Sequence, residues 1–281
     1  MLPILLDLKL LKIYTFGLFA LLAFFWGSYF VWKNIQLTSY KEEDVFDCLF
    51  LGLFGGLFFG RLIYVILNFS AFGFDILKFI LINGYPGINI FGVLIGAFVT
   101  VYLFTKIKKI GFWELMDYLS SPLLLAMGII KIGAFFSGVE VGTKTAFFLS
   151  VKYVGYDGYR HLTPLYQGVL FLIGSYLVFR LVFEIRKQKY FHGFAYIIFW
   201  WLTSLILVTL ENLRINKAIF WGNSFDFIVS FLILLTLSIY LVYYLRNNIF
   251  RGLASVIHLF KIHGRKKDSK NIPGETKKTT S

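Results

Sequence analysis

The chain has little charge, few prolines and almost no cysteine. Only 15% of its 281 residues are charged, while 58% are hydrophobic and 20% are aromatic. A soluble domain of this length could not bury that much apolar surface, so the composition excludes an ordinary globular protein. Five prolines and long apolar runs favour membrane helices over the alternating pattern of a β-barrel. We therefore predict an all-α polytopic membrane protein.

The single cysteine, Cys48, lies inside an apolar run. One cysteine cannot form an internal disulfide, and the sequence contains no CxxC motif and no Cys/His spacing typical of a metal site. We expect Cys48 to be a buried, chemically inert thiol and expect no metal site.

Apolar stretches long enough to cross a bilayer recur along the chain. About seven spans are predicted at this length criterion, and they cover roughly residues 13–33, 46–68, 88–105, 115–136, 164–184, 193–212 and 225–245. Segment 72–82 is too short to span and is predicted to be interfacial or re-entrant. We assign residues 1–262 to a transmembrane domain and 263–281 to a basic, disordered cytoplasmic tail.

The excess of positive charge predicts the orientation. A formal net charge of +13 can indicate nucleic-acid binding, but here the excess lies in short loops and the tail, so we expect no nucleic-acid partner. One basic loop is at 106–109 and another at 186–189, two spans later. With seven spans, both loops share a side with the C-terminal tail. The positive-inside rule puts that side in the cytoplasm and the N-terminus outside.

A lysine interrupts the fourth predicted span. Lys131 is followed by a glycine- and serine-rich stretch, 133–145, that we expect to leave the helix. An ammonium in hydrocarbon costs at least a few kcal/mol, so it normally faces an anion or a wet cavity. We predict that Lys131 and unwound backbone form an anion site. The alternative is a pair with an internal carboxylate such as Asp117 or Glu211.

Four further polar residues lie within or beside the predicted spans. Arg61 follows Gly60 in the second span, and it either has a function or extends to the outer interface. His161 stands at the outer mouth of the fifth span, either as an interfacial anchor or as a proton acceptor. Glu211 and Arg214 lie three residues apart at the end of the sixth span, where they form a structural pair or act in function.

Several motifs occur in a fixed order along these spans. They are Thr15-Phe16-Gly17-Leu18, Gly60-Arg61-Leu62-Ile63-Tyr64-Val65, Asn89-Ile90-Phe91-Gly92-Val93-Leu94-Ile95-Gly96, Asp117 followed by Pro122, Lys131-Ile132-Gly133-Ala134-Phe135-Phe136-Ser137-Gly138 followed by Gly142-Thr143-Lys144-Thr145, His161-Leu162-Thr163-Pro164-Leu165-Tyr166-Gln167, and Glu211 with Arg214. In this order and spacing the chain resembles the prolipoprotein diacylglyceryl transferase family, over roughly residues 13–230.

The resemblance includes departures at polar positions. Phe16 stands where the family usually has a tyrosine, Phe91 where many members have a histidine, and Leu207 where an arginine usually precedes the glutamate by four residues. Lys131 replaces the arginine of the family signature, and Ala134 replaces a polar residue. Arginine binds a phosphate with two bonds and lysine acts as a point charge, so the change at 131 is not neutral.

The resemblance implies a reaction in which a diacylglyceryl group moves from phosphatidylglycerol to the lipobox cysteine thiol of a prolipoprotein, and glycerol phosphate leaves. The implied partners are phosphatidylglycerol, prolipoprotein signal peptides and membrane lipid, and the implied location is the bacterial inner membrane. No metal or organic cofactor is required.

The thiol needs a base and the departing phosphate needs a cation. We predict His161 as the base, with Glu211 next, and Arg214 as a residue that orients Glu211 or joins the phosphate site. The predicted substrate-binding residues are Lys131, Arg61, Gly133, Gly138, Gly142 and Tyr166, the glycines because they let backbone approach the headgroup.

Two alternatives stay open at this point. The first is a non-catalytic homologue that binds lipid or signal peptide, which the lost polar residues favour. The second is a transporter or channel, which would need a polar stripe along several spans and broken helices at mid-membrane.

Overall fold

A computed structural model describes residues 4–7, 12–81, 84–215, 219–220 and 223–268. The chain divides into two compact units, Met1–Leu234 and Leu235–Ser281, which we consider separately. Seven described helices are long and apolar enough to cross a membrane, which confirms the predicted polytopic all-α class. Their boundaries agree with the predicted spans to within a few residues.

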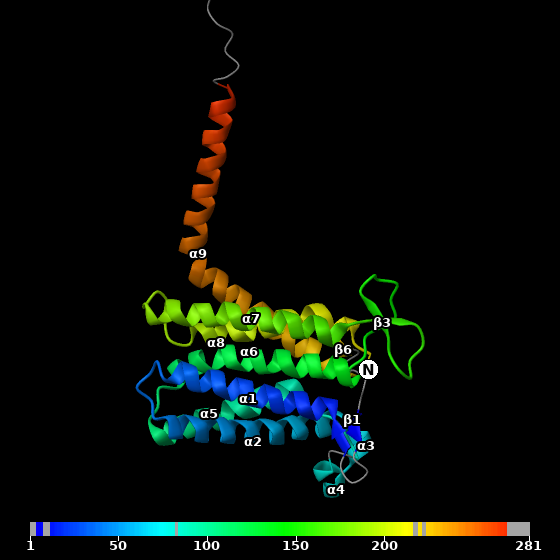
Figure 1. The fold of residues 1–281 in the computed structure, drawn as a ribbon. Coiled ribbons are helices and arrows are strands. Elements are labelled where there is room, and N and C mark those ends of the chain that lie inside the picture. The colour runs from blue at the N-terminus through cyan, green and yellow to red at the C-terminus, as the bar shows by residue number, and fades with distance from the viewer. Residues whose placement is uncertain (1–3, 8–11, 82–83, 216–218, 221–222, 269–281) are drawn as a thin grey trace, which may run out of the picture. The chain divides into compact units, whose positions relative to one another are not determined.

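Six of these helices lie wholly in the first unit and run side by side (Figure 1). They are α1 (Thr15–Ile35), α2 (Glu42–Leu67), α5 (Ile90–Lys108), α6 (Phe112–Ser137), α7 (Thr163–Arg186) and α8 (Phe194–Leu210), the last continued by the 3-10 turn η1 (Glu211–Leu213). Helix α9 (Phe225–Asp268) begins in this unit and forms the described part of the second. Residues 269–281 lie outside the described residues, so the disordered cytoplasmic tail stays a prediction.

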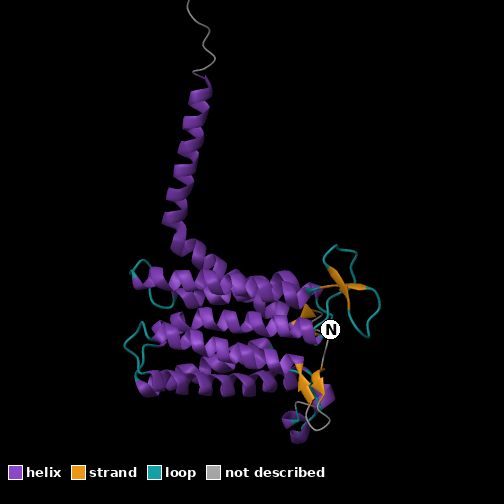
Figure 2. Cartoon of the chain, in the orientation of Figure 1, coloured by secondary structure: helices purple, strands orange, loops and turns teal. Residues whose placement is uncertain are grey.

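Short elements gather at one end of the helices, where Figure 2 shows the strands. The described residues form three antiparallel strand pairs, β1 (Ile4–Asp7) with β2 (Lys12–Tyr14), β3 (Ser150–Lys152) with β4 (Tyr159–His161), and β5 (Ile219–Phe220) with β6 (Asn223–Ser224). The helices α3 (Phe69–Phe72) and α4 (Ile76–Ile80) lie at the same end. The described part of segment 72–82, which ends at residue 81, therefore forms no spanning helix, and the interfacial position of the segment stays a prediction.

Glycines allow α2 and α5 to pack at very short range. A Cβ added at Gly92 would lie 2.8 Å from the Cα of Gly60 and 2.8 Å from the carbonyl oxygen of Phe59. Small residues are the usual means of such packing in membranes, because lipid provides no hydrophobic drive for helices to associate. Gly60 and Gly92 therefore allow the backbones of α2 and α5 to approach closely.

Polar contacts join α6 to its neighbours inside the bundle. The hydroxyls of Ser121 and Ser175 each donate to the other residue's carbonyl oxygen, at 2.9 and 2.8 Å, and so connect α6 to α7. The Asp117 carboxylate accepts hydrogen bonds from the backbone N–H groups of Gly193 and Ala195, at 2.6 and 2.9 Å, and so caps the start of α8. Cys48 is fully buried, as expected.

Two glycine substitutions test the packing. We expect Gly92→Ala to lower stability by about 1–3 kcal/mol, the usual cost of overpacking, because its methyl group would meet backbone atoms of α2. The matched control is Gly17→Ala in α1, where an added Cβ meets nothing within 4 Å. That change should leave stability equal or higher, since alanine is the better helix former. Thermal unfolding in detergent measures both, and equal effects would contradict the packing argument.

Candidate functional site

Five charged residues approach one another at the end of the bundle that carries the strands. This charged cluster consists of Lys131 on α6, Glu140 in the following loop, Glu211 in η1, Arg214 just after it and Asp226 at the start of α9. It contains two cations and three carboxylates. Intramembrane charges that gather in this way usually mark a functional site.

Lys131 is buried and paired. Its side chain is 9% exposed, and its ammonium donates to both carboxylate oxygens of Glu140, each at 2.8 Å. The predicted alternative partners, Asp117 and Glu211, are therefore not the ones it binds. Asp117 lies 14 positions earlier on the same helix, about 21 Å away along the axis, where it caps α8.

The helix does not unwind where the sequence suggested. Helix α6 continues through Gly133 to Ser137 and ends at Gly138, which has the left-handed φ of 73° that favours glycine. A Cβ at Gly133 would lie 2.3 Å from Cβ of Phe19, so this glycine allows α1 to pack on α6. Both glycines thus have structural roles, and their contact with a headgroup stays a prediction.

Backbone pairing brings Glu140 to Arg214. The N–H of Thr143 donates to the carbonyl oxygen of Leu213 at 2.8 Å, and that of Ile215 donates to Val141 at 3.1 Å. Gly142 lies opposite Arg214 in this antiparallel pairing. On its other side a Cβ at Gly142 would stand 2.2 Å from the carbonyl oxygen of His161, so only glycine fits between the two segments.

Arg214 is surrounded by carboxylates at distances longer than a hydrogen bond. Its guanidinium nitrogens lie 4.0 Å from Glu140, 3.8 Å from Glu211 and 3.8 Å from Asp226. Its Nε is buried and has no hydrogen-bond partner among the described residues. Burial acts to lower the pKa of Arg214, but these three carboxylates together raise it. The guanidinium is thus held by electrostatic attraction to the three carboxylates, and its Nε–H donor is left without a hydrogen bond in the described chain.

Glu211 also has unused hydrogen-bonding capacity. The side chain is 1% exposed, and its Oε1 accepts from the Ser224 hydroxyl at 2.9 Å. Its Oε2 is buried and, within the described part of the chain, has no hydrogen-bond donor. The predicted pair with Arg214 is confirmed as an ion pair of 3.8 Å.

Arg61 lies deep in the protein and binds backbone. It is 2% exposed, so its side chain is enclosed by protein. Its guanidinium donates to the carbonyl oxygens of Phe79, Gly87 and Lys78 at 3.0, 2.9 and 2.7 Å. Arg61 therefore anchors the chain between α2 and α5. No described contact joins it to the charged cluster, and its phosphate-binding role stays a prediction.

His161 lies in strand β4, which contacts the segment that pairs with Arg214. Its N–H donates to the carbonyl oxygen of Thr143 at 3.1 Å, and its Nδ1 is buried with no hydrogen-bond partner among the described residues. Thr163, two residues further on, donates from its hydroxyl to the carbonyl oxygen of Leu213 at 2.9 Å, so the chain after β4 reaches the residue before Arg214. The Tyr166 hydroxyl donates to Leu149 at 2.6 Å rather than to any cluster residue in the described chain. The predicted roles of His161 and Tyr166 stay predictions.

Three of the positions where family polar residues are replaced, 91, 134 and 207, hold buried apolar side chains. Phe91 is fully buried with its ring stacked on Trp200 at 6.5 Å, Leu207 is 2% exposed and Ala134 is 1% exposed. At the site itself, Glu211 Oε2 and Arg214 Nε have no hydrogen-bond partner among the described residues. Glu140, Ser224 and Asp226 were missed by the sequence interpretation; Glu140 and Asp226 were visible as acids at span ends, but nothing in the sequence pairs them with Arg214.

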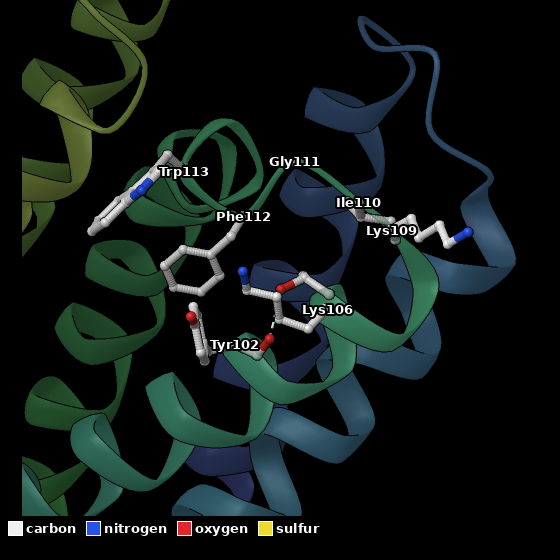
Figure 3. Close-up of a pocket in the computed structure, with 8 residues that line it drawn as sticks. Tyr102, Lys106, Lys109, Ile110, Gly111, Phe112 and Trp113 are labelled. Carbon is white, nitrogen blue, oxygen red and sulfur yellow. Dashed lines mark hydrogen bonds between the residues drawn. The ribbon is translucent and has the colours of Figure 1, made fainter.

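A separate cavity lies at the opposite end of α5. It has a volume of about 600 Å³ and is lined by Tyr102, Thr105, Lys106, Lys109, Ile110, Gly111, Phe112 and Trp113. Figure 3 shows Lys106 near the rings of Tyr102 and Phe112, which meet edge to face. Since Lys106 follows the start of α5 by 16 residues, roughly 24 Å of helix separates this cavity from the charged-cluster end.

Comparison with known proteins gives a consistent family. The model of the prolipoprotein diacylglyceryl transferase family matches residues 3–244. The phosphatidylglycerol–prolipoprotein diacylglyceryl transferase of Clostridium tetani (strain Massachusetts / E88) is 28% identical over 184 residues, which are 63% of this chain and 72% of that protein. The enzyme of the same name from Clostridioides difficile (strain 630) is 28% identical over 192 residues, 68% of this chain and 74% of the relative. That of Listeria welshimeri is 28% identical over 219 residues, 73% and 76% of the two chains.

The anchoring role of Arg61 is testable by hydrogen exchange. Lysine cannot replace the planar guanidinium of Arg61, which donates to three carbonyl oxygens. Each such charge-assisted hydrogen bond contributes about 1.5–3 kcal/mol. We expect Arg61→Lys to raise amide exchange in peptides covering residues 69–81 by roughly tenfold or more, since 1.4 kcal/mol is tenfold. Arg180→Lys is the control, because Arg180 is exposed and donates to the hydroxyl of Tyr176 rather than to backbone carbonyl oxygens in the described chain. Unchanged exchange in Arg61→Lys would contradict the anchor.

The Glu140 pair predicts a dependence of stability on pH. Burial acts to raise the pKa of Glu140, but Lys131 and Arg214 hold it below the ordinary value of 4.5. A depressed carboxyl pKa stabilises the fold above the unfolded value and loses this effect as pH falls through the folded value. We expect thermal unfolding in detergent to show wild type more stable than Glu140→Gln at pH 7, with a margin that shrinks below about pH 4.5.

The control for this margin is Glu184→Gln. Glu184 pairs with Lys187 and Lys189, whose side chains are 63% and 60% exposed, and a surface pair contributes only about 0–1 kcal/mol. A Glu140→Gln margin that stays constant from neutral to acid pH would show that the Lys131 pair does not stabilise the fold.

Proposed function

Since the chain belongs to the prolipoprotein diacylglyceryl transferase family, we propose that its charged cluster is where a diacylglyceryl group passes from phosphatidylglycerol to the prolipoprotein. The protein is a transferase of lipoprotein biosynthesis and a multi-pass protein of the bacterial inner membrane. Neither the non-catalytic nor the transporter reading has support from the relatives, which are named for the transfer reaction.

One observation carries the placement of the reaction. The cation of Arg214 and the carboxylate of Glu211 lie 3.8 Å apart, and both have unused hydrogen-bonding capacity in a buried place. A guanidinium with free donors suits the oxygens of a phosphodiester, and a carboxylate oxygen without a donor suits the proton of a thiol. The reaction requires these two groups side by side, since it forms an anionic leaving group while a thiol loses its proton.

In the proposed step one carbon–sulfur bond forms and one carbon–oxygen bond breaks. Glu211 takes the proton of the lipobox cysteine, and the sulfur attacks the diacylglycerol carbon that carries the phosphate. The new bond is carbon to sulfur, and the bond that breaks joins that carbon to the phosphate oxygen. The electron pair stays on that oxygen, so glycerol phosphate leaves with an added negative charge. Arg214 binds the phosphate oxygens as this charge develops, and the proton on Glu211 passes to the leaving phosphate.

Lys131 has a supporting role in this proposal. Its ammonium is occupied by both oxygens of Glu140, so it is not free to bind phosphate as the sequence suggested. By neutralising Glu140, it keeps that carboxylate at 4.0 Å from Arg214 instead of in a closer pair. The phosphate-binding cation is then Arg214, and Glu211 takes precedence over His161 as the base because it is the one in contact with a cation of the cluster.

The proposed orientation places the charged cluster toward the outside. The basic loops 106–109 and 186–189 lie at the end of the bundle opposite the strands, and the positive-inside rule assigns such loops to the cytoplasm. The N-terminus would then be outside and the C-terminus cytoplasmic. The signal peptide of the prolipoprotein and the phosphatidylglycerol headgroup would reach the cluster from the outer side of the membrane.

A pair of variants tests the two cations separately. Arg214→Ala should lower transfer by roughly 10²-fold or more, the usual cost of removing a preorganised group that stabilises transition-state charge. Lys131→Ala should also abolish detectable transfer, because it frees Glu140 to pair with Arg214. The readout is the mass of a reporter lipoprotein in a strain that lacks its own transferase, where a thioether-linked diacylglyceryl adduct reports activity.

The double variant Lys131→Ala with Glu140→Ala distinguishes support from direct contact. If Lys131 only neutralises Glu140, removing both should recover at least tenfold of the activity lost in Lys131→Ala. A double variant as inactive as the single one would show that Lys131 itself meets the substrate. Full activity in Arg214→Ala would overturn the placement of the reaction at the cluster, and an unmodified reporter with wild type would overturn the transferase function.

A further inference from the structure

Asp226 is the acid of the charged cluster that comes from α9, and it approaches a different guanidinium nitrogen of Arg214 from the one that Glu140 approaches. It is the second residue of α9, and its side chain is 14% exposed. One carboxylate oxygen, Oδ2, lies 3.8 Å from Nη1 of Arg214, and the other, Oδ1, accepts a hydrogen bond of 2.7 Å from the amide nitrogen of Asn89. The same guanidinium nitrogen lies 3.8 Å from Glu211. The same nitrogen of Arg214 therefore lies at equal distance from two carboxylates.

Asn89 is fixed in the orientation that this contact needs. Its side-chain oxygen accepts from the backbone N–H of Gly92 at 2.9 Å and so caps the start of α5. Its own backbone N–H donates to the carbonyl oxygen of Gly60 at 3.1 Å, which ties it to α2. Because the oxygen is occupied by a donor, the amide nitrogen has to face Asp226. Asn89 is 5% exposed, so little water competes for this bond.

The consequence of this arrangement concerns the guanidinium. If Asp226 were neutral or turned away, the attraction of Glu211 for Nη1 of Arg214 would be unopposed. A closer pair would then occupy Oε2 of Glu211, the oxygen that has no donor among the described residues, and would use up guanidinium donors as well. Both groups required by the proposed reaction would be engaged with each other.

We propose that Asp226, locked by its hydrogen bond from Asn89, is a positioning residue that holds the Arg214 guanidinium away from Glu211 and leaves both groups open to substrate. This inference rests on the proposed function. It assigns to Asn89 and Asp226 no contact with the reacting atoms; they act through Arg214.

A charge swap separates the position of the charge from the hydrogen bond. Asp226→Asn removes the negative charge at 226 with almost no change in volume. In the double variant Asn89→Asp with Asp226→Asn, the aspartate at 89 still caps α5, because aspartate and asparagine cap equally well, and the asparagine at 226 can donate to it. The swap keeps the bond between the two positions and moves the charge from one to the other.

The expected results differ between stability and catalysis. Asp226→Asn should lower kcat for a reporter lipoprotein by at least tenfold, with a smaller change in KM for phosphatidylglycerol. The charge swap should restore the thermal unfolding temperature to near the wild-type value but leave kcat tenfold or more below wild type. A merely structural role for Asp226 predicts instead that kcat recovers together with stability.

Wild type and Arg214→Ala serve as references, so that a wrong positioning role for Asp226 can be told from a wrong reaction site. Wild type and Arg214→Ala are measured in the same vesicles of phosphatidylglycerol and phosphatidylethanolamine. If wild type is active and Arg214→Ala is not, while Asp226→Asn keeps wild-type kcat, the positioning role is wrong and the reaction site stands. If Arg214→Ala is as active as wild type, the proposed site itself is wrong. If the charge swap regains wild-type kcat, the hydrogen bond matters and the position of the charge does not.

Discussion

The antiparallel pairing of residues 141–143 with 213–215 decides where the charges of this protein meet. It joins the loop after α6 to the turn after α8, two segments separated by about seventy residues of sequence and by all of α7. Because Gly142 lies between Arg214 and the backbone of His161 with no room for a side chain, the pairing has one register. Glu140 is thereby placed where it meets both Lys131 and Arg214, and the remainder of the cluster is arranged around that guanidinium.

Because the local dielectric constant is low, the distances between these charges decide how strongly they interact. Burying a charge in a membrane interior costs free energy unless the charge is paired. A cluster of two cations and three carboxylates is therefore stable there only when its members contact one another. Within the set the contacts are unequal. Lys131 and Glu140 are bound at 2.8 Å, whereas Arg214 lies 3.8 to 4.0 Å from each of its three acids. The first pair stabilises the site, and the second set of distances leaves a cation able to accept an anionic ligand.

Other buried charges in the bundle serve the fold. Arg61 donates to three carbonyl oxygens of the chain between α2 and α5, and Asp117 accepts from the first backbone N–H groups of α8. In both cases the charge satisfies backbone groups that a membrane would otherwise leave without partners. A charged residue in a predicted span is therefore not by itself evidence of a substrate site, and its contacts have to be known.

Sequence alone determined the class, the seven spans and the family, because span length, charge placement and motif order are local properties of the chain. It also predicted site roles for Lys131, Glu211 and Arg214. It could not determine the partner of Lys131, since Asp117, Glu140 and Glu211 are equally plausible acids until the chain is folded. It also missed Asp226 and Asn89, which lie 137 positions apart and meet through a hydrogen bond. Only the tertiary structure decided which charges are engaged and which are open, because ion-pair distances depend on how separate helix ends are brought together, and no local pattern records that.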